Sequence, residues 1–306
     1  MRVFLTGASG HIASAVIPEL LSAGHHVLGL ARSEDSAAAV AALGAQVLRG
    51  DLDDPNGLGG AAAESDGVIH LAFKHEAMRS GDFEGAVAAD MEAVQAIGDA
   101  LAGTDKPFVN TAGTLMLALG GIAAGGIVGR PGTEEEVIAG GYRVDAENAT
   151  IALAERGVRS AVVRLPPLVH SDLDHHGFAP TLIALAREKG HAAYVGEGAN
   201  RWPAVHTRDA ARLYRLALES APPGSRLHPV ADESVPFHEI AQTIADRLGV
   251  PAISVSAEDA PEHLGFLATF AHLDNPTSSL RTRELLGWEP THPGLIADLQ
   301  DGHYFA

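Results

Sequence analysis

Residues 6–13 read TGASGHIA and lie between a short apolar run and a helical pattern. Gly7 permits a tight turn from strand to helix, and Gly10 lets the backbone come close to a pyrophosphate. Ala13 takes the place of a third glycine, where a methyl group is compatible with helix–strand packing. The first turn of such a helix also presents free N–H groups to an anion. The stretch therefore predicts a dinucleotide-binding turn, with a purely structural turn as the alternative. Its expected contacts are Gly7, Ser9, Gly10, His11 and Ile12.

Short apolar runs alternate with helical patterns through the first half of the chain. This alternation predicts a parallel sheet with helices on both faces, and right-handed crossovers make it doubly wound. We therefore expect an α/β protein with a Rossmann fold. Strands are expected at 2–7, 26–32, 46–52, 67–73, 107–113 and 160–170, and helices at 11–24, 36–44, 83–103 and 145–156.

The pattern loosens after Pro167, where helices recur with short strands between them. We predict a dinucleotide-binding domain over 1–167 and a smaller C-terminal lobe, mainly substrate-binding, over 168–306. The sequence leaves open whether strands of this lobe return to the main sheet.

The composition excludes several classes of protein. The formal net charge is −18 at pH 7, and there is no cysteine. The charge argues against binding to nucleic acid or anionic membranes, and disulfides, thiolate metal sites and cysteine nucleophiles are excluded. The longest uncharged run, 107–129, is rich in glycine, so we interpret it as a buried strand and a glycine-rich loop, not as a membrane helix. No signal peptide is evident, and we expect a cytoplasmic protein.

The end of the second expected strand indicates which nucleotide is bound. NAD-binding proteins place an acid there to hold the ribose 2′-hydroxyl, whereas NADP-binding proteins place an arginine nearby. This strand ends with Arg32 and Ser33. Arg32 could pair with a 2′-phosphate and stack on adenine, so the sequence favours NADP(H) over NAD(H). A solvated surface arginine is the alternative. Asp51 and Leu52 are candidates for the adenine edge, and Leu71 and Ala72 for the ribose.

Together these landmarks resemble the atypical and extended short-chain dehydrogenase/reductases, the group that includes nucleotide-sugar epimerases and dehydratases. The resemblance spans essentially the whole chain. It implies the Rossmann fold, cofactor contacts from Thr111 and Pro166, and a homodimer. The motifs that carry it are TGASGHIA at 6–13, RGDL at 49–52, HLAF at 70–73, VNTAGT at 109–114, RLPPLVH at 164–170, WPAVHTRDAARLYRLAL at 202–218 and LGWEPT at 286–291.

The catalytic pair of that family is missing. There, a tyrosine is the acid/base, and a lysine four residues later lowers its pKa and holds the ribose. None of the three lysines of this chain, Lys74, Lys106 and Lys189, follows a tyrosine at that spacing. In the family, a glutamate often follows the lysine by four residues. Aligning that glutamate with Glu147 puts Arg143 at the lysine position. Arg143 could hold the ribose hydroxyls, but an arginine does not relay a proton.

Several other residues are candidates for the chemistry. Tyr142 could replace the missing acid only if it precedes the helix, because adjacent helical residues point about 100° apart. Thr114 lies near the family's serine position and could bond a substrate carbonyl, or simply its own backbone. His170 is a natural proton donor near neutral pH. Met116, His176, Arg201 and Trp202 are expected at the substrate, although Trp202 could equally belong to the core. The histidine and aspartate residues at 170–176 match no metal-site spacing, so we expect no metal.

Three functions remain in competition. The first is an NADP(H)-dependent oxidoreductase that reduces a carbonyl, or oxidises an alcohol, on a small and partly apolar substrate. The second is a nucleotide-sugar epimerase or dehydratase, which needs a basic pocket for a diphosphate. The third is a dinucleotide-binding sensor without catalysis, which the loss of the tyrosine–lysine pair allows. The retained arginine, threonines and histidines favour an enzyme, and the apolar run at 115–128 suits the less polar substrate of the first function.

Overall fold

A computed structural model describes residues 1–75, 77, 80–124, 129–141 and 143–305. Its central feature is a seven-stranded sheet in the order β10-β6-β5-β4-β1-β2-β3, in which every pair of neighbours is parallel. The strand order reverses between β1 and β4, which is where open α/β sheets bind ligands. The predicted α/β fold with a doubly wound parallel sheet is confirmed. The strands are β1 (Arg2–Thr6), β2 (His26–Ala31), β3 (Gln46–Arg49), β4 (Gly67–His70), β5 (Pro107–Gly113), β6 (Arg159–Leu165) and β10 (Ser225–Leu227).

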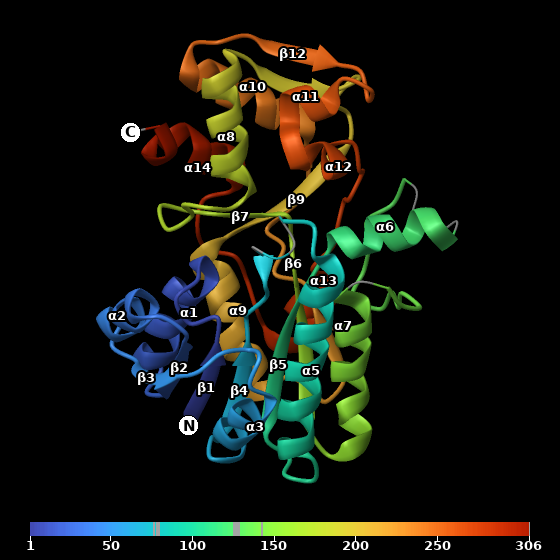
Figure 1. The fold of residues 1–306 in the computed structure, drawn as a ribbon. Coiled ribbons are helices and arrows are strands. Elements are labelled where there is room, and N and C mark those ends of the chain that lie inside the picture. The colour runs from blue at the N-terminus through green and yellow to red at the C-terminus, as the bar shows by residue number, and fades with distance from the viewer. Residues whose placement is uncertain (76, 78–79, 125–128, 142, 306) are drawn as a thin grey trace.

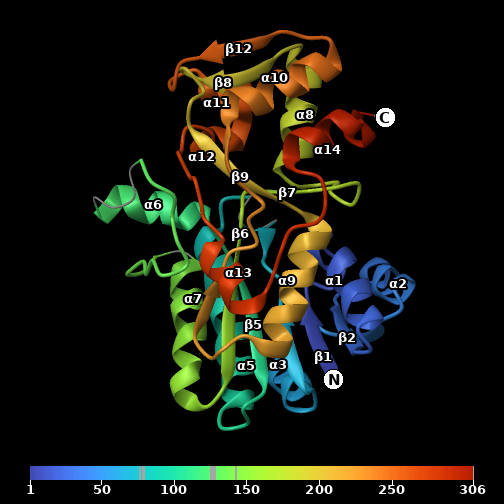
Figure 2. The same ribbon diagram turned by 180° about the vertical axis from the view of Figure 1, so that it is seen from behind.

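Helices cover both faces of this sheet. In Figure 1, α5 and α7 lie in front with α3 beside them, and Figure 2 shows α9 and α13 on the opposite face, where α9 packs against α1. Side chains along β1 alternate between two cores: Val3 and Leu5 enter one, and Phe4 enters the other. Burial on both faces is what an all-parallel sheet requires. The helices are α1 (His11–Ser22), α2 (Glu34–Ala42), α3 (Pro55–Ala63), α5 (Phe83–Leu101), α7 (Arg143–Ala152), η1 (Leu153–Arg156), α9 (Thr207–Ser220) and α13 (Leu280–Leu286).

The C-terminal part of the chain builds a lobe over the end of the sheet at which β6 leads into β7 (Figure 1). The lobe has a hydrophobic core of its own, centred on Trp202 and Phe237, whose rings meet edge-on at 4.9 Å. β10 also comes from this half of the chain, yet it pairs with β6 in the main sheet. The elements of the lobe are β7 (Leu168–His170), α8 (Phe178–Lys189), β8 (Ala192–Val195), β9 (Arg201–His206), β11 (Asp232–Pro236), α10 (Phe237–Leu248), β12 (Ala252–Val255), α11 (Ala260–Leu264), η2 (Gly265–Leu267), α12 (Ala268–Ala271), α14 (Leu295–Asp301) and η3 (His303–Phe305).

The uncharged run at 107–129 contains a helix where a glycine-rich loop was expected. Strand β5 ends at Gly113, and α6 (Leu115–Ala124) follows at once. Leucine, methionine and alanine are good helix formers, and α6 buries Leu115 and Ala118 against Leu273. Packing against a distant part of the chain thus offsets the low helix propensity of its glycines. No helix in the described part of the chain is long and apolar enough to span a membrane.

A buried network of charged side chains connects β10 to the rest of the main sheet. Glu147 on α7 accepts hydrogen bonds from Arg164 of β6, at 3.1 Å from Nε to Oε2, and from Arg226 of β10, at 2.7 Å from Nε to Oε1. The side chains of Glu147 and Arg164 are 2% and 1% exposed, so both charges depend on this pairing.

Replacing Glu147 by alanine should lower the free energy of unfolding by about 3–5 kcal/mol, because buried guanidinium groups would lose their counter-charge. Urea denaturation followed by circular dichroism measures the loss. The matched control is Glu155→Ala at an exposed position of η1, which should change stability by about 0.5 kcal/mol at most. Equal losses in the two variants would show that the network is not the cause.

Candidate active site

The glycine-rich turn lies between β1 and α1, against the end of β4. Gly7 has a φ of +66°, and a Cβ atom there would lie 2.7 Å from the backbone nitrogen of Ala72. The turn closes with a hydrogen bond from the Gly10 nitrogen to the Gly7 oxygen at 3.0 Å. Gly10 is the N-cap of α1 and provides no side-chain cap, so the first N–H groups of the helix are left for an external acceptor. This arrangement fits the phosphates of a dinucleotide, and it brings Leu71 and Ala72 beside the predicted turn.

The ends of β2 and β3 bring two arginines together. Arg32 and Ser33 follow β2 and are exposed. Arg49, at the end of β3, pairs in register with Ala31 and donates from Nη1 to the backbone oxygen of Ser33. Its Nη2 also lies 3.2 Å from Oε1 of Glu34, whose side chain is 93% exposed. Arg49 is not among the contacts predicted from the sequence, although it is the first residue of the RGDL landmark.

The other candidates for the adenine end have local structural roles as well. The Ser33 hydroxyl caps α2 by accepting from the Ser36 nitrogen at 3.1 Å. Asp51 accepts from the Asp53 nitrogen at 3.2 Å, and Leu52 is 9% exposed within the core on the α3 side. Both Asp51 and Leu52 lie just past β3, at the same edge of the sheet as Arg32.

Arg143 begins α7 and reaches back over the end of β5. Its Nη2 donates to the backbone oxygen of Thr111 at 2.8 Å, and its guanidinium lies 4.3 Å from the ring centre of Phe73. Its Nε lies 3.7 Å from Oδ2 of Asp90 on α5. Arg143 is therefore fixed at the edge of the sheet, close to the strands that flank the glycine turn. Tyr142, the candidate acid beside it, lies outside the described residues.

The two threonines after β5 have different surroundings. The Thr111 hydroxyl donates to the backbone oxygen of His70 at 2.8 Å and accepts from the Tyr214 hydroxyl, also at 2.8 Å. Thr114 is fully buried, and Nδ2 of Asn275 donates to its hydroxyl at 3.0 Å. Asn275 therefore directs the hydroxyl hydrogen of Thr114 away from itself, so that Thr114 can act as a donor. The sequence contains no local signal for this pair.

An apolar wall adjoins Thr114. Met116 and Leu119 on α6 pack with Phe178 and Phe270 around Leu273 and the buried face of α6. Trp202 is fully buried, with its ring 5.8 Å from that of Phe178, so it supports this wall from the core of the lobe. These contacts come from three separate parts of the chain, and they form an apolar patch of partly exposed side chains beside α6.

The remaining candidates lie in or beside β7 and β9, which form a separate three-stranded sheet with β11. His170 is fully buried and its Nδ1 lies 2.8 Å from Oδ2 of Asp298. Pro166 is buried and His176 is exposed. Arg201 is held by Asp274, with Nη2 at 2.7 Å from Oδ2. Among the described residues, no group of three or more histidines and carboxylates could hold a metal ion.

His11 connects the glycine turn to the lobe. Its Nε2 lies 2.9 Å from Oγ1 of Thr207, and its Nδ1 lies 3.5 Å from Oδ1 of Asp174. Burial lowers the pKa of His11 to about 4, and the nearby imidazoles of His175, His170 and His176 contribute to the same direction. His11 is therefore neutral at pH 7 and adds hydrogen bonds, but no charge, to the start of α1.

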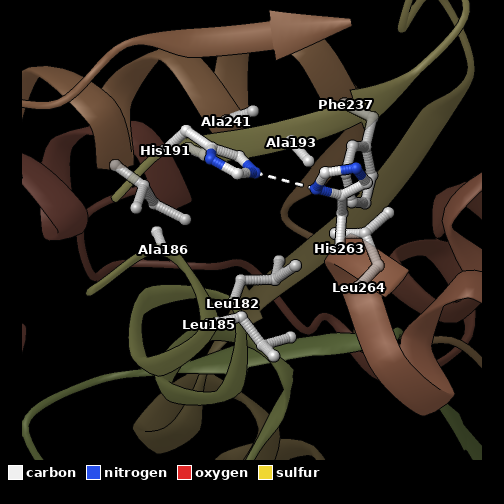
Figure 3. Close-up of a pocket in the computed structure, with 11 residues that line it drawn as sticks. Leu182, Leu185, Ala186, His191, Ala193, Phe237, Ala241, His263 and Leu264 are labelled. Atoms are coloured by element: carbon white, nitrogen blue, oxygen red, sulfur yellow. Dashed lines mark hydrogen bonds between the residues drawn. The ribbon is translucent and has the colours of Figure 1, made fainter. Parts of the chain in front are cut away.

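A pocket elsewhere in the lobe is not part of this site. Figure 3 shows it between α8, β8, α10 and α11, with Nε2 of His191 lying 2.9 Å from Nδ1 of His263. Its volume of about 10 Å³ has room for no more than about one water molecule. It is too small for a substrate.

The imidazole of His11 should titrate near pH 4, well below the ordinary value of 6.5. Heteronuclear NMR of the ring nitrogens measures this midpoint. Between pH 6.5 and 4 the unfolded chain binds the proton and the folded chain does not, so stability should fall as the pH falls through this window, by up to about 1.4 kcal/mol per pH unit. His11→Gln should make the stability curve flatter there. A midpoint near 6.5 would contradict the assigned burial.

Known proteins resemble this chain along its whole length. It is 44% identical to the uncharacterized protein C2A9.02 of Schizosaccharomyces pombe, over 100% of both chains. The 2-alkyl-3-oxoalkanoate reductase of Stenotrophomonas maltophilia is 26% identical over 83% of this chain and 77% of that protein. The crystal structure of UDP-glucuronic acid 4-epimerase from Bacillus cereus, in complex with UDP-glucuronic acid and NAD, has a TM-score of 0.75 and 16% identity, over 99% of this chain and 98% of that chain.

The NmrA-like family model matches residues 1–114, the part that holds the glycine turn and β1 to β5. The full-length relative, the glycine turn and the parallel sheet agree with the resemblance that the sequence motifs indicated, which is thereby confirmed. The chain belongs to the short-chain dehydrogenase/reductase family, as an atypical extended member without the tyrosine–lysine pair.

Proposed function

We propose that the protein is an NADP(H)-dependent oxidoreductase that interconverts a carbonyl and an alcohol on a small, partly apolar substrate. The observation that carries the proposal is the meeting of three features at one edge of the sheet. These are the glycine turn around Gly7, the guanidinium of Arg143 and the buried hydroxyl of Thr114 next to an apolar wall. When bound, the cofactor would supply or accept the hydride. The N–H groups at the start of α1 would hold its phosphates.

The pair of arginines after β2 and β3 supports NADP(H) over NAD(H). A 2′-phosphate is a dianion, and two guanidinium groups can offer it several charge-assisted hydrogen bonds. Arg49 is held beside Ser33 by its own hydrogen bond, and its pairing with the exposed Glu34 is of the weak kind found at protein surfaces. A 2′-phosphate could therefore displace Glu34 with little loss of free energy.

The chemistry needs a proton donor other than a lysine-activated tyrosine. We propose Tyr142 for this role, with Thr114 bonding the substrate oxygen as a donor. The fixed positive charge of Arg143, one residue further along the chain, would favour the phenolate that remains after proton transfer. His170 is a weaker candidate, because its Nδ1 is already bonded to Asp298.

The name of one relative agrees with this substrate class. The Stenotrophomonas maltophilia protein is a 2-alkyl-3-oxoalkanoate reductase, a name that combines a carbonyl with alkyl groups. Alkyl groups of that kind match the apolar wall formed by Met116, Leu119, Phe178 and Phe270. Carbonyl compounds with alkyl substituents are therefore the first substrates to test.

The nucleotide-sugar alternative needs arginines for a diphosphate, and three of the described candidates in the C-terminal half of the chain already have acidic partners, whereas Arg187 is exposed on α8. Arg201 is paired with Asp274 at 2.7 Å, and Arg208 is paired with Asp172 at 2.8 Å. Arg212 lies 3.3 Å from Oδ1 of Asp209 in the same way. A diphosphate would have to break these pairs. The sensor alternative differs only in turnover, so binding of NADPH without activity on any carbonyl would favour it.

Arg49→Gln should weaken NADPH binding about tenfold or more while leaving NADH binding nearly unchanged, because only NADPH carries the 2′-phosphate. Glu34→Gln should strengthen NADPH binding, because it removes a competing carboxylate from Arg49. Fluorescence titration of both nucleotides measures the two dissociation constants for each variant.

Arg32→Gln should also weaken NADPH binding and leave NADH binding nearly unchanged. The matched control is Arg2→Gln, because Arg2 lies at the far end of β1 and donates to the backbone oxygen of Glu64. Equal affinity of the native protein for NADH and NADPH would overturn the choice of cofactor. Failure to bind either nucleotide would overturn the proposed function.

Tyr142→Phe should lower turnover of a carbonyl substrate by roughly 10²-fold or more, as expected when a general acid is removed. NADPH affinity should not change, which separates a loss of chemistry from a loss of binding. The assay follows NADPH oxidation by its absorbance under saturating cofactor. Tyr194→Phe, on strand β8 of the lobe, is the control. Normal turnover in Tyr142→Phe would transfer the role to Thr114 or to water.

A further inference from the structure

A chain of buried polar groups joins the glycine turn to Arg143. It begins at Thr6, the last residue of β1, whose Oγ1 lies 2.7 Å from Nδ1 of His70 at the end of β4. Nε2 of His70 lies 3.2 Å from Oδ1 of Asp90. Oδ2 of Asp90 faces Nε of Arg143 at 3.7 Å. Thr6 and His70 are fully buried and Asp90 is 2% exposed, so the groups interact in an environment with little water.

We propose that Asp90 is a positioning residue that holds Arg143 against the nicotinamide half of the bound dinucleotide. The proposal rests on the function proposed above. Asp90 itself would not touch the cofactor. It would act through the guanidinium of Arg143, which takes the place of the family's lysine.

The direction of each hydrogen bond in the chain follows from the charge of Asp90. Burial opposes ionisation of this carboxyl, but the hydrogen bond from His70 and the positive charge of Arg143 outweigh it and hold the pKa of Asp90 below its ordinary value. An ionised carboxylate only accepts, so His70 carries its proton on Nε2. Nδ1 of His70 then accepts from the Thr6 hydroxyl, whose oxygen accepts from the Ala72 nitrogen at 3.3 Å.

With His70 protonated on Nε2, a carboxylate attracts both neighbours at this position. Nε2 of His70 lies within hydrogen-bond distance of Oδ1, and Nε of Arg143 lies at ion-pair distance from Oδ2. An asparagine would remove the negative charge that faces Arg143, and its NH₂ group would face a donor on one side as long as His70 keeps this tautomer. The substitution Asp90→Asn would thus preserve the volume of the side chain and destroy the contact with Arg143 or with His70.

The position of Arg143 indicates a role beyond stability. Its side chain is 20% exposed, whereas the rest of the chain of polar groups is buried, so the network ends at the surface of the site. Its Nε is buried and makes no hydrogen bond within the described residues. A buried ion pair contributes little net stability compared with apolar side chains. It does fix the orientation of a planar guanidinium, whose Nη2 is already bonded to the Thr111 oxygen at 2.8 Å.

The test compares a whole dinucleotide with its adenine half. Dissociation constants of NADPH and of adenosine 2′,5′-bisphosphate are measured by calorimetry for the native protein and for Asp90→Asn. We expect Asp90→Asn to weaken NADPH about tenfold, the size typical for losing a charge-assisted contact, and to leave the bisphosphate within about twofold. The matched control is Asp99→Asn on the same helix, whose partner Arg156 is far from the turn and whose side chain is 69% exposed. It should change neither constant.

If Asp90 had a purely structural role, Asp90→Asn would weaken the binding of both ligands to the same extent or of neither. Either result would overturn the proposal. If Asp90→Asn does not fold, Arg143→Met gives a second measure, because it should show the same selective loss of NADPH affinity. Where both variants fold, Asp90→Asn combined with Arg143→Met should lose little more than either alone. Additive losses would mean that Asp90 does not act through Arg143. A native protein that binds the bisphosphate but not NADPH would overturn the proposed function as well.

Discussion

The close passage of the glycine turn over the end of β4 is the constraint on which the site depends. Gly7 approaches the backbone of Leu71 and Ala72 so closely that no side chain fits between them. This contact fixes Thr6 opposite His70 in the β1–β4 register, at the point where the strand order reverses. The same turn starts α1 at His11, so the uncapped N–H groups at the start of the helix and the first members of the buried polar chain have a common origin.

Local signals account for what the sequence predicted well. The parallel sheet follows from alternating apolar runs and helices, and the turn follows from glycines at a fixed spacing between a strand and a helix. Helix α6 was missed because its glycines argue against a helix, while the contact with Leu273 that stabilises it is distant in sequence. Arg49 was missed because strand pairing, and not adjacency in the chain, brings it to Ser33.

The candidate site shows the same division between local and distant information. The glycine turn, Leu71, Ala72 and Arg143 could be located from motifs, and the structure brings them to one edge of the sheet. The partners that orient Arg143 and Thr114 could not be located from motifs. Asp90 contacts Arg143 from another helix, and Asn275 contacts Thr114 from 161 positions further along the chain. His170 illustrates the opposite case, since its sequence position suggested a proton donor at a cleft and the structure buries it against Asp298.

An arginine at the lysine position changes what the site can do. A lysine can lose its proton and pass it on, whereas a guanidinium stays charged under all ordinary conditions. Arg143 therefore supplies a permanent positive charge, and the buried carboxylate of Asp90 balances it inside the fold. Such a pair can orient a ribose and favour a nearby anion, but the proton must come from another group. On the proposed function, the loss of the lysine would separate the two tasks that the resemblance assigns to one residue: positioning would stay with Arg143, and proton transfer would pass to the neighbouring hydroxyl groups.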